Sequence, residues 1–316
     1  MKVAFAGVFA GHVADRVRAR LRIPCEVTLT DDREIGDVDV LVSMAFTREM
    51  AATAPRLRLV QVPGAGLDRI DRAALAPGTA LANAYGHDVG IAEYVIGAML
   101  AVTRTFCRID ADLRRGRWDS VWSGAPVPLW PELAGKTLGI LGYGRIGQAV
   151  ARRALAFDMD VLAIRRDASR PDPHGLPFLR GPAALDEVLG RADYLAITLA
   201  LTPETRGLIG ARELARMKPT AVLVNVARGE VVDEDALYDA LHRRAIAGAA
   251  LDVWYRYPAD AAPVHPGHRP FHELPNVLMT PHVSGWTEGM MDARAGVIAE
   301  NIHRTARGEA PVNLVP

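Results

Sequence analysis

One histidine lies in a segment whose residues favour proton transfer. His282 follows an apolar run in NVLMTPHVSG, and histidine is the side chain that changes charge nearest to neutral pH. A catalytic histidine usually has a neighbour that holds its ring and tunes its charge. The earlier stretch ALDVWYRYPAD continues from Asp252 with aromatic residues and offers no further carboxylate until its last residue. The sequence therefore predicts a general acid or base at His282 and leaves its partner open.

A glycine-rich turn predicts a dinucleotide site. The segment KTLGILGYGRIG contains a G-x-G-x-x-G array between an apolar run and the helical pattern RIGQAVARRALAF. Such glycines permit a tight turn and a close approach of the backbone to a pyrophosphate, which the N-terminal end of the helix attracts. The predicted cofactor site comprises six consecutive residues: Gly142, Tyr143, Gly144, Arg145, Ile146 and Gly147.

The next expected strand, DVLAIRRD, ends in two basic residues, Arg165 and Arg166. At this position an acid normally accepts hydrogen bonds from the adenosine ribose. Two guanidinium groups instead suit a 2′-phosphate, through charge-assisted and often bidentate bonds, and favour NADP over NAD. In the alternative interpretation both arginines are solvated and Asp167 binds the ribose of NAD.

The composition excludes several classes of function. The chain has 316 residues, half of them hydrophobic, with 37 basic and 37 acidic side chains. This predicts a soluble protein of two ordinary domains or one large one, without bulk attraction for nucleic acid or membrane surfaces. Two widely separated cysteines, Cys25 and Cys107, fit a reducing compartment. The N-terminal apolar run is broken by glycine and followed by charge, unlike a signal peptide. We expect a cytoplasmic protein.

Apolar runs alternate with helical patterns along the chain, which is typical of α/β proteins with parallel strands. One long helix is expected over 88–116, with Ile91, Val95, Met99 and Phe106 on its buried face, and another over 287–307. The predicted domains are a nucleotide-binding domain at 89–283, inserted in an outer domain formed by 1–88 and 284–316. Strands are expected at 2–7, 38–43, 57–63, 79–84, 136–142, 160–165, 194–199, 221–227, 245–253 and 276–281.

Five further segments share the order of a known family. They are VPGAGLDRID, IAEYVIGAML, LVNVARGEVVDEDAL, GAALDV and NVLMTPHVSG. With the glycine array they cover essentially the whole chain, which resembles the D-isomer-specific 2-hydroxyacid dehydrogenase family. The resemblance implies two Rossmann-like domains with doubly wound parallel sheets and a homodimer built largely on the nucleotide domain. It also implies hydride transfer between NAD(P)H and a small 2-oxo or 2-hydroxy acid, such as glyoxylate or hydroxypyruvate.

The resemblance assigns roles to residues of the nucleotide domain. Arg228 resembles the arginine that holds the substrate carboxylate and carbonyl, for which a planar, permanently charged fork is suited. His282 resembles the general acid/base. Asp252 resembles the residue that orients the nicotinamide carboxamide, and Ala227 is expected to contact the cofactor.

In the outer domain the resemblance concerns substrate binding. Gly64, Ala65 and Gly66 resemble the loop whose N–H groups meet the substrate carboxylate. His87 and Trp286 are expected to shape the substrate pocket. No metal is expected, because His265, His268 and His272 lie in a Pro-rich loop without an obvious carboxylate or cysteine ligand.

One position departs from the family pattern. A glutamate normally stands five residues after the nicotinamide aspartate, just before a proline, and this chain has Tyr257 before Pro258. The usual charged partner of His282 is therefore missing, and Glu273 is a candidate replacement from elsewhere in the chain.

Two alternative functions stay open at this stage. Formate dehydrogenases, a branch of the same superfamily, also lack the glutamate, and their reaction needs no base, although His87 stands where that branch has an asparagine. Proteins of the superfamily also act as nucleotide-sensing corepressors, against which the intact Arg228 and His282 argue.

Overall fold

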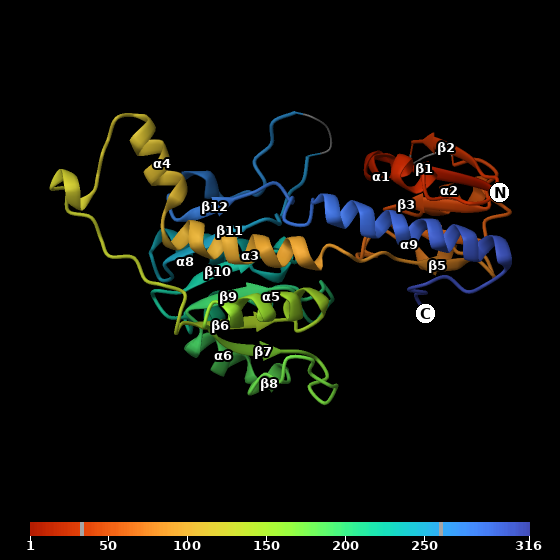
Figure 1. The fold of residues 1–316 in the computed structure, drawn as a ribbon. Coiled ribbons are helices and arrows are strands. Elements are labelled where there is room, and N and C mark those ends of the chain that lie inside the picture. The colour runs from red at the N-terminus through yellow and green to blue at the C-terminus, as the bar shows by residue number, and fades with distance from the viewer. Residues whose placement is uncertain (32–34, 259–261) are drawn as a thin grey trace. The chain divides into compact units, whose positions relative to one another are not determined.

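The chain forms two compact units. The computed structural model describes residues 1–31, 35–258 and 262–316. Unit 1 comprises Met1–His87 and Trp286–Pro316, and unit 2 comprises Asp88–Gly285 (Figure 1). The chain thus leaves unit 1 once and returns to it once. Each unit is built on a parallel sheet with helices packed on it, which confirms the predicted α/β fold class.

Unit 1 contains a five-stranded parallel sheet in the order β2-β1-β3-β4-β5. The chain goes from β1 to β2 on one side and then to β3 on the other, so the strand order reverses between β1 and β3. In open parallel sheets ligands bind outside the carboxyl ends of the strands at such a point. The strands are β1 (Lys2–Ala6), β2 (Glu26–Thr30), β3 (Val40–Ser43), β4 (Leu59–Gln61) and β5 (Ala80–Ala82).

Helices cover both faces of this sheet. Helices α1 (Val8–Arg18) and α9 (Glu288–Arg307) pack together on one face, and α2 (Arg48–Thr53) packs on the other. Helix α9 begins after Thr287, whose hydroxyl accepts the N–H of Met290. Its buried side chains include Met291, Ala295, Ile298 and Ile302, which confirms the helix expected over 287–307. A short 3₁₀ helix spans Arg72–Ala74.

Unit 2 contains a seven-stranded parallel sheet in the order β12-β11-β10-β9-β6-β7-β8. Its strand order reverses between β6 and β9, where the glycine turn follows β6. The strands are β6 (Thr137–Leu141), β7 (Asp160–Ile164), β8 (Phe178–Arg180), β9 (Tyr194–Ile197), β10 (Val222–Asn225), β11 (Gly248–Leu251) and β12 (Val277–Met279).

The two faces of this sheet have separate apolar cores. Helices α3 and α5 cover one face, and α6, α7 and α8 cover the other. The helices are α3 (Asp88–Thr103), α4 (Phe106–Arg114), α5 (Arg145–Ala156), α6 (Leu185–Arg191), α7 (Ala211–Leu214) and α8 (Glu234–His242). Short 3₁₀ helices span Val121–Ser123, Pro182–Ala184, Gly229–Val231 and Phe271–Glu273.

The single long helix expected over 88–116 is wrong. Thr105 adopts a left-handed backbone conformation with φ 52° and separates α3 from α4, which are bent by 58°. Helix α3 packs on α5 and the sheet, whereas Asp112 is the only buried residue of α4. Phe106, expected on the buried face, is exposed. The apolar spacing continues beyond the part of the helix that packs on α5 and the sheet, whereas the chain turns at Thr105.

Two strands were not expected from the sequence. Both β2 and β8 lie at sheet edges. None of the residues of β2 is fully buried, and β8 has only three residues. Neither segment has the continuous apolar run that marks the central strands.

Among the described residues no single helix is long and apolar enough to cross a membrane. Only α3 and α4 meet the length and composition requirement, and they do so only as a bent pair.

Candidate active site

The glycine turn after β6 has the geometry that a phosphate-binding loop needs. Gly142 adopts φ 105°, and a Cβ there would lie 2.6 Å from the backbone nitrogen of Leu199. A Cβ at Gly147 would overlap the carbonyl oxygen of Gly142, whereas a Cβ at Gly144 would meet no protein atom within 4 Å. The first and third glycines therefore allow the turn and its packing, and the middle one borders open space that a pyrophosphate can approach.

Helix α5 begins directly at this turn. Its N-cap, Gly144, offers no side-chain acceptor, and its first turn contains no acidic residue. The N–H groups there carry partial positive charge and attract phosphate oxygens. Of the other residues predicted here, Tyr143 is buried and donates its hydroxyl to Asp172 at 2.7 Å, and Ile146 packs against the core. Arg145 has its Nε 3.9 Å from the carboxylate of Asp88.

The residues after β7 divide into one arginine that holds a loop and one that faces solvent. Arg165 donates to backbone carbonyls of the loop 168–171. Arg166 is exposed and has no hydrogen bond or ion pair among the described residues, although its charge helps to lower the pKa of Glu204. Asp167 accepts from the hydroxyl and the N–H of Ser169, which hold the pKa of its carboxyl below the usual value. A 2′-phosphate would therefore meet Arg166 more readily than Arg165.

Arg228 follows β10 in a turn that Asn225 fixes. The side-chain amide of Asn225 donates to the carbonyl of Arg228 at 2.9 Å, and its oxygen accepts the N–H of Ala227 at 3.0 Å. A Cβ at Gly229 would lie 2.5 Å from the carbonyl carbon of Trp254, so the loops after β10 and β11 touch. The half-buried guanidinium of Arg228 donates to the carbonyl of Ala227 at 2.8 Å.

Asp252 follows β11 and anchors the loop that carries His282. Its side chain is fully buried and accepts three hydrogen bonds from that loop. The donors are the hydroxyl of Thr280 at 2.6 Å and the N–H groups of Val283 and Ser284, each at 2.9 Å. Both carboxylate oxygens are thus occupied by the chain itself, which fixes the loop.

A second layer of hydrogen bonds supports this anchor. Because Thr280 donates to Asp252, the hydroxyl of Tyr94 donates to Thr280, at 2.7 Å. Burial raises the pKa of Tyr94 to about 12, so the phenol keeps its proton. The indole of Trp254 donates to the carbonyl of Thr280 at 2.8 Å. Sequence reasoning missed Tyr94, Trp254 and Thr280, because each contributes only through its contact in space.

The partner of His282 is Tyr257, the residue at the position of the family glutamate. The phenol oxygen lies 2.9 Å from Nδ1 of His282 and accepts the N–H of Trp254 at 3.4 Å. Burial is the largest of the effects that raise the pKa of Tyr257, so the hydroxyl is protonated and donates to Nδ1. The bonding pattern assigns the hydrogen of the neutral imidazole to Nε2. The proposed replacement, Glu273, instead lies 3.9 Å from His272.

The environment of His282 favours its neutral form. Partial enclosure of the ring is the largest cause that lowers its pKa from about 6.5; Asp252 opposes the shift and the positive charge of Arg228 adds to it. The residue as a whole is exposed, so its ring can exchange a proton with solvent. The backbone of His282 is left-handed, with φ 58°, a conformation that is uncommon for non-glycine residues.

Unit 1 contains the other residues predicted to bind substrate. The loop Gly64–Gly66 follows β4, and its carbonyls accept the N–H of Ala84 and the side chain of Asn83, both at 3.1 Å. The N–H groups of Gly64, Ala65 and Gly66 have no acceptor among the described residues.

The two expected pocket residues, Trp286 and His87, also belong to unit 1. The half-exposed ring of Trp286 packs edge-on against Phe9 and His12, with centroids 5.4 Å apart in each pair. His87 is half-buried.

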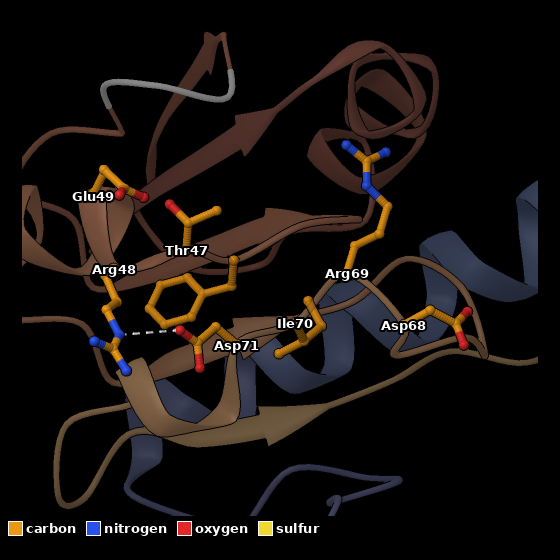
Figure 2. Close-up of a pocket in the computed structure, with 8 residues that line it drawn as sticks. Thr47, Arg48, Glu49, Asp68, Arg69, Ile70 and Asp71 are labelled. Atoms are coloured by element: carbon orange, nitrogen blue, oxygen red, sulfur yellow. Dashed lines mark ion pairs between the residues drawn. The ribbon is translucent and has the colours of Figure 1, made fainter. Parts of the chain in front are cut away.

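A surface hollow in unit 1 lies apart from all these residues. It has a volume of about 420 Å³ and opens beside the start of α2. Figure 2 shows Arg48 facing Asp71 across it, with 3.4 Å between Nε and the carboxylate, while Asp68 and Arg69 point away from that pair. None of the residues predicted to act in chemistry lines it.

The expectation that the histidines of the Pro-rich loop lack carboxylate support is wrong for His268. Its two ring nitrogens lie 2.8 Å from Glu234 and 2.9 Å from Asp235. The hydrogen bond to Asp235 is the largest cause that raises the pKa of His268. His265 and His272 stack with ring centroids 4.1 Å apart. The part of the chain that the structure describes contains no cluster of three or more ligands suited to a metal.

Comparison with known proteins shows the family to which the chain belongs. The family model described as "D-isomer specific 2-hydroxyacid dehydrogenase, NAD binding domain" matches residues 96–284. The chain belongs to the D-isomer specific 2-hydroxyacid dehydrogenase family. The glycine turn, Arg228, Asp252 and His282 all lie in the matched segment.

Named members of the dehydrogenase family resemble the chain over most of its length. A glyoxylate reductase of Thermococcus gammatolerans is 38% identical over 93% of this chain and 86% of its own. A D-3-phosphoglycerate dehydrogenase of Methanocaldococcus jannaschii is 37% identical over 89% of this chain, which spans only 52% of that relative.

A solved dehydrogenase structure has the same fold. It is the NADPH-dependent glyoxylate/hydroxypyruvate reductase of Sinorhizobium meliloti in complex with NADP and malonate. It is 30% identical, with a TM-score of 0.82, and the match covers 99% of this chain and 96% of that one.

Proposed function

We propose that the protein is an NAD(P)H-dependent reductase of small 2-oxo acids of the glyoxylate and hydroxypyruvate class. One observation carries the proposal: Arg228, Asp252 and His282 follow the adjacent strands β10, β11 and β12, with the charges of Arg228 and Asp252 acting on His282. The named glyoxylate reductase and glyoxylate/hydroxypyruvate reductase support it.

The residues of unit 2 have complementary tasks in this reaction. When bound, the nicotinamide supplies the hydride. Arg228 binds the carboxylate of the substrate and stabilises negative charge on its carbonyl oxygen. His282, in its protonated form, donates the proton from Nε2 to that oxygen, which yields the 2-hydroxy acid. Asp252 and Tyr257 hold the loop and the ring of His282 in place. Direct contact of Asp252 and Ala227 with the nicotinamide stays a prediction.

For the cofactor we propose a preference for NADP. The open space at Gly144 and the uncapped end of α5 fit the pyrophosphate that NAD and NADP share. Arg166, exposed and without a hydrogen bond or ion pair among the described residues, is the group that would recognise a 2′-phosphate.

We also propose that the protein is a homodimer formed through unit 2. Helix α4 and the connector after it extend away from the sheet of unit 2 (Figure 1). They expose large apolar side chains, among them Leu113, Trp118, Trp122 and Leu129, of which Trp122 is 92% exposed. Such a surface is typical of protein–protein contacts. Sedimentation equilibrium of the wild type and of a Trp122→Ser variant tests the assignment, since only the wild type should dimerise strongly.

A substrate panel tests the main proposal. Glyoxylate, hydroxypyruvate, pyruvate and larger 2-oxo acids are assayed with NADH and with NADPH, and formate is assayed with the oxidised cofactors. We expect reduction of at least one small 2-oxo acid and no oxidation of formate. Turnover of formate alone would favour the formate alternative. Nucleotide binding without any turnover would favour the corepressor alternative.

A further inference from the structure

One side chain of the glycine turn points into the protein and contacts a loop of the cofactor domain. Tyr143 stands between the first two glycines of the array and is only 2% exposed, so the protein itself covers its ring. The ring packs in the core that α3 and α5 share with the sheet. Its hydroxyl donates to the carboxylate of Asp172 at 2.7 Å. Asp172 lies in the loop 165–177, which joins β7 to β8.

Asp172 connects the phenol to the backbone of this loop. Oδ1 of Asp172 also accepts the N–H of His174 at 3.0 Å, and Oδ2 accepts the N–H of Leu176. Burial opposes ionisation of Asp172, but the N–H of His174, the phenol and the N–H of Leu176 lower its pKa. Burial is the largest cause that raises the pKa of Tyr143. The bond therefore joins a protonated phenol to a carboxylate, and such charge-assisted bonds are roughly twice as strong as neutral ones.

The glycine turn and the start of the loop are also joined by other contacts. The N–H groups of Gly142 and Tyr143 both donate to the carbonyl of Ile164, the last residue of β7, at 2.9 Å. The guanidinium carbon of Arg165 lies 6.0 Å from the centre of the Tyr143 ring, and its nitrogens donate to carbonyls of the loop 168–171. Tyr143 is thus in contact with both ends of the segment that these bonds hold.

The position of the loop 165–177 relates it to the cofactor. It begins at the carboxyl end of β7, beside β6 and the glycine turn, where the adenosine ribose of a dinucleotide binds. Arg166 and Asp167, the two candidate ligands of that ribose or its 2′-phosphate, belong to it. Residues 166–170 are all exposed, so side-chain hydrogen bonds rather than burial hold this part of the loop. A loop that already has its bound conformation loses less entropy when the ligand arrives.

We propose that Tyr143 and Asp172 are positioning residues that hold the loop 165–177 in the conformation that binds the adenosine half of the cofactor. Tyr143 then acts on the cofactor through Asp172 and not by contact of its ring. The inference requires a nicotinamide dinucleotide, but neither a particular 2-oxo acid nor the preference for NADP. Since only the adenosine half is involved, loss of the phenol should weaken cofactor binding and leave the hydride-transfer step unchanged.

Kinetics and calorimetry of Tyr143→Phe, which removes only the hydroxyl, test the proposal. We expect KM for NADPH and for NADH to rise about threefold to tenfold, with kcat and KM of the 2-oxo acid within about twofold of the wild type. The Kd of ADP-ribose, which has the adenosine half and lacks nicotinamide, should rise by the same factor. Unchanged binding of ADP-ribose, or a fall in kcat with KM of the cofactor unchanged, overturns the proposal.

Two further substitutions complete this experiment. Asp172→Asn keeps an oxygen for Tyr143 and His174 and loses the acceptor for Leu176, so it should weaken ADP-ribose binding less than Asp172→Ala does. Tyr194→Phe is the matched control, because Tyr194 is an equally buried phenol that shares a hydrogen bond with a threonine at the opposite edge of the same sheet. It should leave ADP-ribose binding unchanged, and an equal loss in Tyr194→Phe overturns the proposal.

Amide hydrogen exchange of the whole protein shows whether the loop itself responds. In the ligand-free wild type the N–H groups of His174 and Leu176 are bonded to Asp172 and should exchange slowly. In Tyr143→Phe they should exchange at least about threefold faster, and saturating ADP-ribose should restore most of their protection. Exchange in α5 should be the same in both proteins. Unchanged exchange in the loop, or faster exchange throughout α5, overturns the proposal.

The measurements also separate this inference from the proposed function. Weaker binding of ADP-ribose by Tyr143→Phe, in a protein that reduces no 2-oxo acid, would support the positioning role and reject the reductase. Reduction of 2-oxo acids with a cofactor KM that does not depend on Tyr143 or Asp172 would reject the positioning role and keep the reductase.

Discussion

The carboxyl edges of the two parallel sheets differ in how their charged groups are satisfied. In unit 2 the chain itself supplies the partners: Asp252 accepts three hydrogen bonds, His282 has Tyr257, and Arg165 holds carbonyls of its own loop. In unit 1 the buried Arg294 has no hydrogen bond or ion pair among the described residues. Asp252 and His282 of unit 2 thus have hydrogen-bond partners from the chain, whereas Arg294 of unit 1 has none among the described residues.

The difference separates preorganisation from ligand binding. Groups that must keep their geometry while bonds change gain from fixed partners, because no reorganisation is then needed during the reaction. A group that only binds an anion can stay unpaired until the anion arrives, at a cost in stability of the free protein. Variants of each unit can test whether the charged groups of unit 2 depend on fixed partners and whether Arg294 of unit 1 is left unpaired for an anion.

The largest effect is expected from removing the anchor of unit 2. Asp252→Ala leaves the hydroxyl of Thr280 and the N–H groups of Val283 and Ser284 without an acceptor, each costing about 1–3 kcal/mol where the group is buried. We expect the free energy of unfolding, measured with urea, to fall by about 4 kcal/mol. Asp252→Asn keeps one acceptor oxygen and should cost less. Since Arg294→Met is expected to cost nothing, equal losses in Asp252→Ala and Arg294→Met would remove the contrast between the units.

Arg228 tests the chemistry of the same edge. Arg228→Lys keeps the charge but loses the planar fork, so kcat/KM for a 2-oxo acid should fall roughly 100-fold or more, about 2.7 kcal/mol. Arg243→Lys, an exposed position on the same unit, serves as the control and should be silent. Activity of Arg228→Lys within a few-fold of the wild type would show that the substrate carboxylate binds elsewhere.

The cofactor prediction distinguishes the two arginines after β7. Arg166→Ala should lower kcat/KM for NADPH about tenfold or more through loss of one charge-assisted contact, and leave that for NADH nearly unchanged. Arg165→Ala releases the loop 168–171 and should affect both cofactors alike. Equal use of NADH and NADPH by the wild type would instead favour Asp167 as the ribose ligand.

An element of the fold can be predicted only where its packing or backbone geometry restricts which residues the sequence can have. The central strands are predictable because burial on both faces requires continuous apolar runs, whereas the edge strands β2 and β8 leave no such run. The break between α3 and α4 at Thr105 is missed because apolar spacing does not reveal where the packed surface ends. The glycine turn is predictable because its backbone admits no side chain at Gly142 and Gly147.

The site shows the same division. Arg228 and His282 stand in motifs, so the sequence alone singles them out. The hydrogen bonds from Tyr94 through Thr280 to Asp252 join three separate segments and become visible only in the fold. From the sequence alone, Arg294 looks like an ordinary polar residue of an amphipathic helix. Its burial and its lack of a partner are properties of the packed structure.

The smallest effect, and the most specific, concerns the phenol on His282. Reduction of an oxoacid needs the protonated imidazole, and partial enclosure lowers the pKa of His282, with Arg228 adding to the shift. The reductive kcat/KM of the wild type should therefore decline as pH rises through a value below about 6.5. Tyr257→Glu places a carboxylate beside the ring, favours the cation and should move the declining limb to higher pH by about one unit.

Tyr257→Phe provides the matched comparison. It keeps the aromatic ring but removes the hydroxyl that donates to Nδ1, a bond that favours neutral His282. The limb should move slightly upward, and kcat should fall by about threefold to tenfold because one hydrogen bond of about 1 kcal/mol no longer holds the ring. A substitution that only disturbed packing would lower the rate without moving the limb. If neither Tyr257→Glu nor Tyr257→Phe shifts the pH profile, the phenol does not affect the pKa of His282. Of the fixed hydrogen bonds in unit 2, only those of Asp252 would then support the site.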